Sequence, residues 1–520
     1  MGQKPTKVAF IALGCAKNLV DSEKMLGQLA EHGAIITSDE SDADVIVVNT
    51  CGFLEASRVE AHEAIAEAVE QKRTGRCRRV VVAGCLVQRD GERLLDAVPG
   101  IDALVGVHQR DDVVTAALSP LLGKNEKRGG RNTRSPKGKK TETRPRPDLF
   151  LGDYHPYVAT DTARLRLTPR HYAYLRISEG CNQRCTFCTI PAIRGPMHCK
   201  PVEVILAEAR ELASDQAVEL NLIGQDTTSY GRDIGYGPGL AGLLRELNRL
   251  DEVAWIRLLY AYPTDFTDEM IDAIAECERV VKYIDIPLQH INDRILKAMH
   301  RRVTRRQTET LLQRLRDRIP GVTIRTTFIA GFPGETEAEF EELLTFVKEF
   351  GFSAVGVFPY SQEPDTPAGR MKGQLPAEVK EARADAIMEV QQEVAFAQAA
   401  RRRGQLLDVL IDAKLKDGQY VGRHAGQAPE VDSVTYVLTA LPDARKKAGR
   451  ASAVPTRARG KKTTAHGTAR YRPAAHSLQP GEIVRVVCEG SQGYDLIARP
   501  TSVMLPVLNL TQMAGAHEDG

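Results

Sequence analysis

Three cysteines in one short segment, Cys181, Cys185 and Cys188, give the strongest chemical signal in the chain. Their CxxxCxxC spacing can supply three thiolates to a cubane iron–sulfur cluster and leave its fourth iron without a protein ligand. Such an iron can bind and reduce a small molecule, whereas a four-cysteine cluster mainly carries electrons. Phe187 could place its ring beside a bound planar base. The alternatives are a disulfide or a zinc site, but zinc usually takes a fourth ligand, commonly from paired CxxC units.

A second group of cysteines is spread over the first part of the chain. Each one closes a short apolar run: 7–14 ends at Cys15, 44–50 at Cys51, and 79–84 at Cys85. Continuous Val and Ile runs are typical of parallel strands buried on both faces. The amphipathic segments 22–32 and 55–72 predict helices between them, and this alternation indicates a doubly wound α/β domain.

The three strand-end cysteines are expected to lie together, because the carboxyl ends of parallel strands share one edge of a sheet. They would then form a second three-thiolate site, assembled from distant parts of the sequence. The alternative is that each is a small residue buried at a strand end, as free cysteines often are.

The region 171–396 repeats the alternation of strands and helices. Strands are predicted at 172–177, 218–223, 255–260, 283–286, 323–329 and 354–358, with a helix at 201–213. About six such units fit an open parallel barrel, whose chemistry lies on loops at the carboxyl ends of the strands. The candidate ligand-binding loops contain Gly224, Gln225 and Asp226; residues 285–290; and Gly331, Gly334 and Glu335. Each could be only a turn, since Gly and Pro occur in loops everywhere.

The C-terminal region is predicted to be a small β-barrel. Five short strands are expected, at 406–411, 420–423, 434–438, 483–487 and 494–498. That number suggests a barrel of the oligonucleotide-binding kind. Two stretches, 124–146 and 441–472, each hold ten Lys or Arg residues with at most two acidic ones, and are predicted to be disordered. They would attract nucleic acid through counterion release, or serve only as solubilising insertions.

The length and composition limit the class of protein and the number of domains. With 520 residues, 42% hydrophobic and 27% charged, it reads as an ordinary globular protein with room for about three domains. No apolar run reaches 18 residues, so no membrane-spanning helix is expected. Ten cysteines are too sparse for a disulfide scaffold, and a cytoplasmic location is expected because clusters need reduced thiolates. Several residues are interpreted as bystanders, either structural or solvent-exposed: Cys77, Cys199, Cys277, Cys488, His290 and His300.

The triad at 181–188 resembles that of the radical S-adenosylmethionine (SAM) superfamily. The segments 13–18, 21–23, 49–51 and 84–85 resemble the opening of the methylthiotransferases within it. The resemblance implies SAM and two 4Fe-4S clusters as cofactors. It assigns Cys15, Cys51 and Cys85 to an auxiliary cluster that handles sulfur, and Cys181, Cys185 and Cys188 to the cluster that cleaves SAM. It also implies SAM contacts from Phe187, the loop 224–226 and the loop 331–335, and it identifies no catalytic side chain.

Residues 225–228 and 285–290 resemble the methylthiotransferase branch that modifies an aspartate of small-subunit ribosomal protein twelve. That branch implies hydrogen abstraction from the aspartate β-carbon by a deoxyadenosyl radical, because general acid–base catalysis supplies only about 10²–10⁴-fold. The implied partner is the ribosomal protein or the assembled 30S ribosome. Contact with rRNA is expected through a C-terminal TRAM domain and the basic stretches. Residues 197–200 depart from the branch, which would show a more basic run there.

Two alternative functions remain open: a methylthiotransferase of tRNA adenosine, and a non-catalytic iron–sulfur RNA-binding sensor. The sequence names neither the electron donor nor the source of sulfur. The predicted organisation is an N-terminal methylthiotransferase domain at 5–120, a basic linker at 121–169, a radical SAM core at 170–400 and a TRAM domain at 402–505 with the basic insert 441–472.

Overall fold

The computed structural model describes residues 4–119, 146–154, 160–439 and 477–501. Apart from Arg146, the basic stretches 124–146 and 441–472 lie outside these residues. The chain divides into two compact units, Met1–Val390 and Gln391–Gly520, and each is described by itself. The division falls inside helix α13 (Ala377–Arg401), before the predicted boundary at 400–402.

The N-terminal part of the first unit is a six-stranded parallel sheet in the order β2-β1-β3-β4-β5-β6. Its strands are β1 (Lys7–Ala12), β2 (Ile35–Thr37), β3 (Val45–Thr50), β4 (Arg79–Gly84), β5 (Ala103–Val105) and β6 (Asp148–Phe150). Its helices are α1 (Ala16–Glu31), α2 (Glu55–Thr74), α3 (Cys85–Asp90), α4 (Arg93–Ala97) and α5 (Val113–Leu118). Strand β6 lies within the predicted linker, so part of that linker belongs to the sheet.

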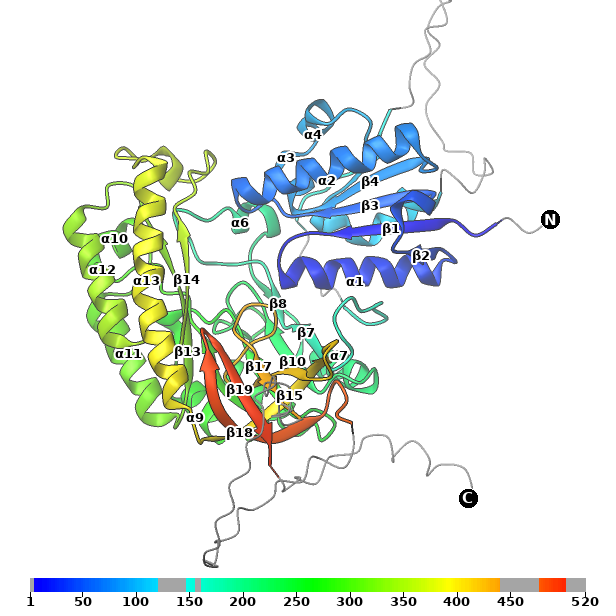
Figure 1. The fold of residues 1–520 in the computed structure, drawn as a ribbon. Helices are drawn as coiled ribbons and strands as arrows, with labels where there is room; N and C mark the ends of the chain where they lie inside the picture. The colour runs from blue at the N-terminus through cyan, green and yellow to red at the C-terminus, as the bar shows by residue number, and fades with distance from the viewer. Residues whose placement is uncertain (1–3, 120–145, 155–159, 440–476, 502–520) are drawn as a thin grey trace, which may run out of the picture. The chain divides into compact units, whose positions relative to one another are not determined.

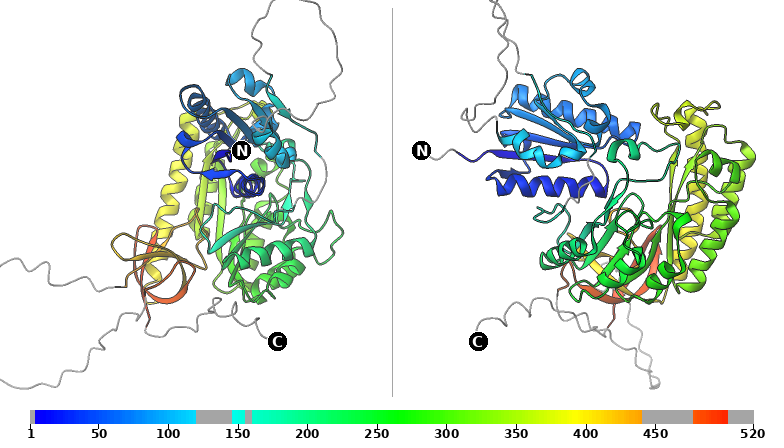
Figure 2. Two further views of the ribbon diagram at one scale, coloured as in Figure 1. Left: turned by 90° about the vertical axis from the view of Figure 1, so that its right-hand side faces the viewer. Right: turned by 180° about the vertical axis from the view of Figure 1, so that it is seen from behind.

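Helices cover both faces of this sheet, as predicted for a doubly wound domain (Figure 1, Figure 2). Successive residues of β3 point to opposite faces, as the pleat of a strand requires. Val45 belongs to the core with Met25 of α1, whereas Ile46 belongs to the core with Ile65 of α2. The continuous apolar runs in the sequence are therefore explained by burial on two sides.

Helix α1 begins at Ala16 rather than at the predicted residue 22. Its first turns bury polar side chains, among them Lys17, Asn18 and Asp21. Because these side chains break the apolar periodicity from which helices are predicted, the start of the helix was placed too late. The polar first turns belong to the site described below.

The central part of the first unit is an open sheet of six parallel strands in chain order, the partial barrel that was predicted (Figure 1). The strands are β7 (Tyr172–Arg176), β10 (Glu219–Ile223), β11 (Trp255–Leu258), β12 (Val280–Asp285), β13 (Thr323–Ala330) and β14 (Ala354–Pro359). The helices between them include α7 (Val202–Ser214), α8 (Gly239–Leu247), α9 (Asp268–Glu276), α10 (Asp293–Ala298), α11 (Arg305–Arg318) and α12 (Glu337–Phe350). A short hairpin of β8 (Ser178–Glu179) and β9 (His198–Cys199) encloses the cysteine loop and α6 (Ile190–Arg194).

A buried carboxylate from the central part holds the N-terminal part in place. Glu363, in the loop after β14, has a side chain only 1% exposed. Its oxygens accept from Arg89 of α3 at 2.7 Å and from the backbone N–H of Glu55, the first residue of α2, at 3.0 Å. Glu363 therefore neutralises a buried guanidinium and satisfies a free amide at a helix start.

The second unit contains a closed five-stranded barrel in the order β15-β16-β17-β19-β18. Its strands are β15 (Leu406–Lys414), β16 (Tyr420–His424), β17 (Thr435–Val437), β18 (Ile483–Gln492) and β19 (Asp495–Pro500). Inward side chains such as Val409, Ile411 and Val486 fill its core. The five predicted strands are thus confirmed. Among the described residues, no helix is both long enough and apolar enough to cross a membrane.

Candidate active site

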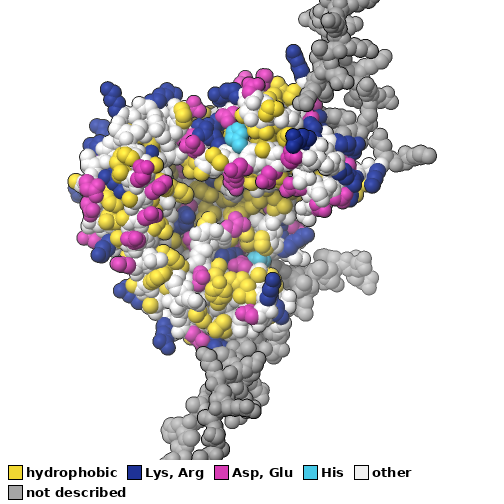
Figure 3. Space-filling model, turned by 45° about the horizontal axis from the view of Figure 1, so that its top comes forward, with side chains coloured by type: hydrophobic (Ala, Val, Ile, Leu, Met, Phe, Trp, Pro, Cys, Tyr) yellow, Lys and Arg dark blue, Asp and Glu magenta, His cyan; other side chains and the backbone are white. Residues whose placement is uncertain are grey.

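All six cysteines singled out from the sequence line one cavity of about 420 Å³ in the first unit. Cys15 precedes α1, Cys51 follows β3 and Cys85 follows β4, so these three come from strand ends of the N-terminal sheet. The other three lie in the loop between β8 and α6. In the space-filling view, one face of the molecule is hollowed and hydrophobic side chains gather in the hollow (Figure 3).

The N-terminal triad depends on close backbone approaches at two glycines. Gly14 and Gly84 have φ angles of +97° and +98°, and each directly precedes a cysteine of the triad. A Cβ on Gly14 would lie 2.9 Å from the Cβ of Cys51, and one on Gly84 would lie 2.3 Å from Oδ1 of Asn49. Glycine is needed at both positions because of the backbone conformation and because of the space.

We expect Gly14→Ala to weaken metal loading at this triad. The added methyl group would strain a left-handed backbone and press on Cys51, displacing one ligand from the other two. Gly33→Ala is the matched control, since Gly33 also has a positive φ, of +81°, but a Cβ there meets nothing within 4 Å. Iron analysis after anaerobic reconstitution should show a loss only for Gly14→Ala. Equal iron contents in the two variants would contradict the expectation.

The second triad is held by contacts to the helix α10 region. Thr186 donates from its backbone to the carbonyl of Met299 at 3.1 Å and from its hydroxyl to the carbonyl of Ala298 at 2.8 Å. Arg301, which is 7% exposed, lies 3.6 Å from Sγ of Cys185. Its guanidinium also stacks over the ring of Tyr262, 4.1 Å from the centroid. The loop is therefore anchored on one side and faces a cation.

Arg194 connects the two triads. It follows the second triad on α6, is 1% exposed, and donates to Sγ of Cys85 in the first triad at 3.3 Å. It also pairs at 3.0 Å with Asp21 of α1 and at 3.0 Å with Glu179, which lies just before the cysteine loop. These contacts place one fixed positive charge against the first triad, on the helix that follows the second.

The thiols have unequal acidity. Burial raises the pKa of Cys85 to about 12, although Arg194 lies beside it, and it raises the pKa of Cys188 to about 12 and of Cys181 to about 11. Burial also acts on Cys15, but Lys17 and Arg194 bring the pKa of this thiol below its ordinary value. Metal ligation requires thiolates, so loading of these sites must release protons.

The donor set suits iron–sulfur clusters. In a cubane each thiolate binds a different iron, so three thiols ligate three irons and leave the fourth open. Two sets of three sulfurs, each with an arginine against one of its members, suit two anionic clusters.

The predicted SAM-contacting residues are only partly brought to the cavity. Phe187 and Gln225 line it, whereas Gly224 and Asp226 flank Gln225 without lining it. Asp226 accepts from Gln183 at 2.9 Å and from Ser229 at 2.8 Å. The loop of Gly331, Gly334 and Glu335 does not line the cavity either, and its contact with SAM stays a prediction.

Glu335 has contacts of its own within that loop. It accepts from the backbone N–H groups of Gly331 and Phe332 and pairs with Arg383 at 2.7 Å. His290 lies 3.5 Å from Glu335 and is buried, whereas His300 is exposed. Neither histidine lines the cavity, and the same is true of the four bystander cysteines, Cys77, Cys199, Cys277 and Cys488.

Sequence patterns missed the cations and tyrosines of the cavity. Lys17, Arg194 and Arg301 line it, together with Tyr260 and Tyr262. A weak signal existed for two of them, because Lys17 lies two residues after Cys15 and Arg194 lies six residues after Cys188. Their partners are distant in sequence, and only the fold brings them together.

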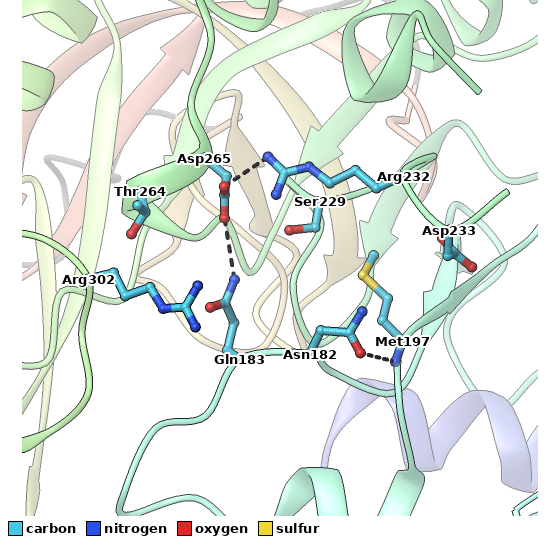
Figure 4. Close-up of a pocket in the computed structure, with 9 residues that line it drawn as sticks. All are labelled: Asn182, Gln183, Met197, Ser229, Arg232, Asp233, Thr264, Asp265 and Arg302. Atoms are coloured by element: carbon cyan, nitrogen blue, oxygen red, sulfur yellow. Dashed lines mark hydrogen bonds and ion pairs between the residues drawn. The ribbon is translucent and has the colours of Figure 1, made fainter. Parts of the chain in front are cut away.

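A smaller polar pocket of about 190 Å³ lies next to the cysteine loop (Figure 4). Asp265 bridges it by accepting from Gln183 at 3.3 Å and from Arg232 at 2.8 Å, and Arg302 points toward Gln183. Gln183 lines this pocket and also the cysteine cavity. Gln183 of the cysteine loop therefore separates this pocket from the cysteine cavity, and Asp265 holds its side chain.

Three family models match parts of this chain. Residues 175–347 match the model of the radical SAM superfamily, residues 7–106 that of the uncharacterized protein family UPF0004, and residues 404–455 that of the TRAM domain. In the solved radical S-adenosylmethionine methyltransferase TsrM from Kitasatospora setae, 15% of aligned residues are identical, with a TM-score of 0.49 and coverage of 70% of this chain and 74% of that one.

Two curated relatives are much more similar in sequence. The ribosomal protein uS12 methylthiotransferase RimO of Symbiobacterium thermophilum is 41% identical over 528 residues, covering 98% of this chain and 96% of the relative. RimO of Anaeromyxobacter sp. (strain K) is 45% identical over 434 residues, covering 83% and 87%. With this identity over nearly the whole length, and with two cysteine triads facing one cavity, the chain belongs to the RimO family of ribosomal protein uS12 methylthiotransferases.

Proposed function

We propose that this protein adds a methylthio group to the β-carbon of an aspartate in ribosomal protein uS12, using SAM and two 4Fe-4S clusters. The observation that carries the proposal is that two separate sets of three sulfurs open onto one cavity. Bound there, the clusters and SAM would supply the electrons, the deoxyadenosyl radical, the sulfur and the methyl group. Cys181, Cys185 and Cys188 would hold the cluster that cleaves SAM, and Cys15, Cys51 and Cys85 the auxiliary cluster.

The cavity lining suits a radical reaction at an unactivated carbon. Among the described residues that line it there is no Asp, Glu or His. A carboxylate or imidazole is the usual general base, and even a well-placed base could not remove hydrogen from an unactivated carbon. Apolar side chains such as Phe53, Ile190 and Ile193 would keep water away from a reactive radical.

Gln225 is suited to contact SAM. Its Nε2 donates to Glu179 at 2.7 Å, which fixes the side chain, and its buried Oε1 has no partner among the described residues. A buried carbonyl oxygen of this kind requires a donor, and the amino group of SAM could be that donor. We propose that Phe187 and Gln225 contact SAM with the flanking Gly224 and Asp226. The loop of Gly331, Gly334 and Glu335 lies at the carboxyl end of β13, and we propose that it also contacts SAM.

The proposed partner is uS12, either free or in the assembled 30S ribosome. The matched TRAM domain and the closed barrel of the second unit support an rRNA contact through that unit. The basic stretches 124–146 and 441–472 would add to this contact through counterion release. The proposed place of action is the cytoplasm, where the substrate is assembled.

Anaerobically reconstituted protein, supplied with SAM and dithionite, tests the proposal. With uS12 or 30S subunits present, we expect deoxyadenosine in the solution and an added SCH₂ mass on one aspartate-containing uS12 peptide, both detected by mass spectrometry. A parallel incubation with tRNA should leave the tRNA unmodified. An adduct on adenosine would identify the tRNA enzyme instead, and the absence of deoxyadenosine would favour the non-catalytic sensor.

A further inference from the structure

The cavity contains one buried lysine, Lys17, that forms no ion pair with a described carboxylate. Three cations line the cavity: Lys17, Arg194 and Arg301. Arg194 is paired with two carboxylates, as described above. For Lys17, only 7% exposed, no described Asp or Glu lies within ion-pair distance. A buried ammonium is costly unless it is paired, so this position is suited to receive an anion.

Lys17 is held in place by an aromatic ring. Its Nζ lies over Tyr260, 3.2 Å from the ring centroid, a cation–π arrangement that partly compensates the loss of water. Tyr260 has a φ of +59°, a backbone conformation that residues other than glycine rarely adopt. Its backbone N–H donates to Asp285 at 3.1 Å, and its carbonyl accepts from Thr227 at 3.1 Å. Such strain persists where the surroundings enforce it, and it is common at ligand-binding positions.

Arg301 is the third cation, and its surroundings differ from those of Lys17. It stacks on Tyr262, donates to the carbonyl of Pro287 and faces Cys185 of the second triad. Lys17 lies instead beside the first triad, two residues after Cys15. In the proposed reaction, sulfur joins the substrate at the first triad, so the target residue must come close to Lys17.

We infer that Lys17 binds the side-chain carboxylate of the target aspartate and thereby makes the enzyme selective for an acidic residue. The inference rests on the proposed function, which provides an aspartate as substrate. That carboxylate is attached directly to the reacting β-carbon and must enter a cavity lined by six sulfur ligands and no acidic side chain. Without a cation to receive it, its desolvation and its repulsion by the anionic clusters would exclude it. Lys17 supplies that cation at the side of the cavity where the new bond forms.

The test compares two forms of uS12, one with the target aspartate and one with that aspartate replaced by asparagine. Dissociation constants of both forms are measured for the reconstituted wild-type enzyme and for Lys17→Met. We expect the wild type to bind the aspartate form roughly 30-fold or more tightly, as for a buried charge pair. In Lys17→Met this preference should fall to near one, because both changes remove the same interaction.

Two further variants make the measurement specific. Lys17→Arg keeps the charge and should keep part of the preference for aspartate. Lys24→Met is the matched control on the same helix, since Nζ of Lys24 donates to the carbonyl of Thr162 and does not line the cavity. It should retain the full wild-type preference.

The outcomes separate this inference from the proposed function. An enzyme that modifies uS12 but shows the same aspartate preference in Lys17→Met would overturn the inference alone. So would a Lys17→Met variant that loses iron, or shifts the reduction potential of the auxiliary cluster, while weakening both forms of uS12 equally; Lys17 would then only balance the charge of the triad. A wild type that modifies no uS12 would overturn both.

Discussion

Replacing Cys15, Cys51 and Cys85 together by alanine should leave a protein that still cleaves SAM but transfers no methylthio group to uS12. The three thiols lie at strand ends of the N-terminal sheet, whereas the triad assigned to SAM cleavage lies in the loop before α6. Only one of the two proposed clusters should therefore be lost. We expect roughly half of the iron to remain, with deoxyadenosine still formed and no adduct on uS12.

The reciprocal variant, with Cys181, Cys185 and Cys188 replaced, should also keep roughly half of the iron but form no deoxyadenosine. Cys77→Ala with Cys277→Ala is the matched control, because both thiols are buried and neither lines the cavity. That control should keep all of the iron and the full activity. Iron contents that do not change when the first triad is removed would contradict the assignment of two clusters.

Glu219→Ala should cost about 3–5 kcal/mol in the free energy of unfolding. Glu219 of β10 and Arg257 of β11 form an ion pair at 2.7 Å, and both side chains are fully buried. The guanidinium also lies 4.7 Å from the centroid of the Tyr283 ring on β12. Removing the carboxylate takes the 2.7 Å ion pair from a fully buried guanidinium, and urea denaturation of the metal-free protein measures the loss.

Two comparisons show whether loss of the ion pair is the cause. Glu246 pairs with Arg249 on the surface, where the arginine side chain is 72% exposed, so Glu246→Ala should cost about 1 kcal/mol or less. Glu219→Leu combined with Arg257→Met removes both charges and should recover most of the stability lost in Glu219→Ala. A double variant no more stable than Glu219→Ala would show that packing, not charge, holds this position.

Much of the fold follows from local sequence. The Val and Ile runs of β3 and β4 can be recognised as strands, because burial on both faces requires continuous apolar residues. The short outer strands β2, β5 and β6 were not predicted, since three residues carry too little pattern. Strand β12 begins at Val280, three residues before its predicted start.

Of the residues predicted for the site, the six cysteines, Phe187 and Gln225 line the cavity, whereas its cations and tyrosines were not predicted. Arg194 reaches Cys85 across 109 residues of sequence, and Lys17 lies over Tyr260 from another part of the first unit. Contacts of this kind arise from tertiary packing and have no local pattern. The loop of Glu335 has Gly and Pro residues typical of a ligand-binding turn and is held by a bond from its own backbone to the carboxylate; its contact with SAM stays a prediction.

The contact of Glu363 with Arg89 has a consequence for how the protein matures. The two residues are 274 positions apart, so during translation at about 5–20 residues per second Arg89 emerges roughly 15–55 s before its carboxylate exists. Over that interval the nascent N-terminal sheet lacks one of its contacts with the rest of the first unit, and the cavity that its three thiols line is incomplete. Cofactor insertion should therefore follow completion of the first unit.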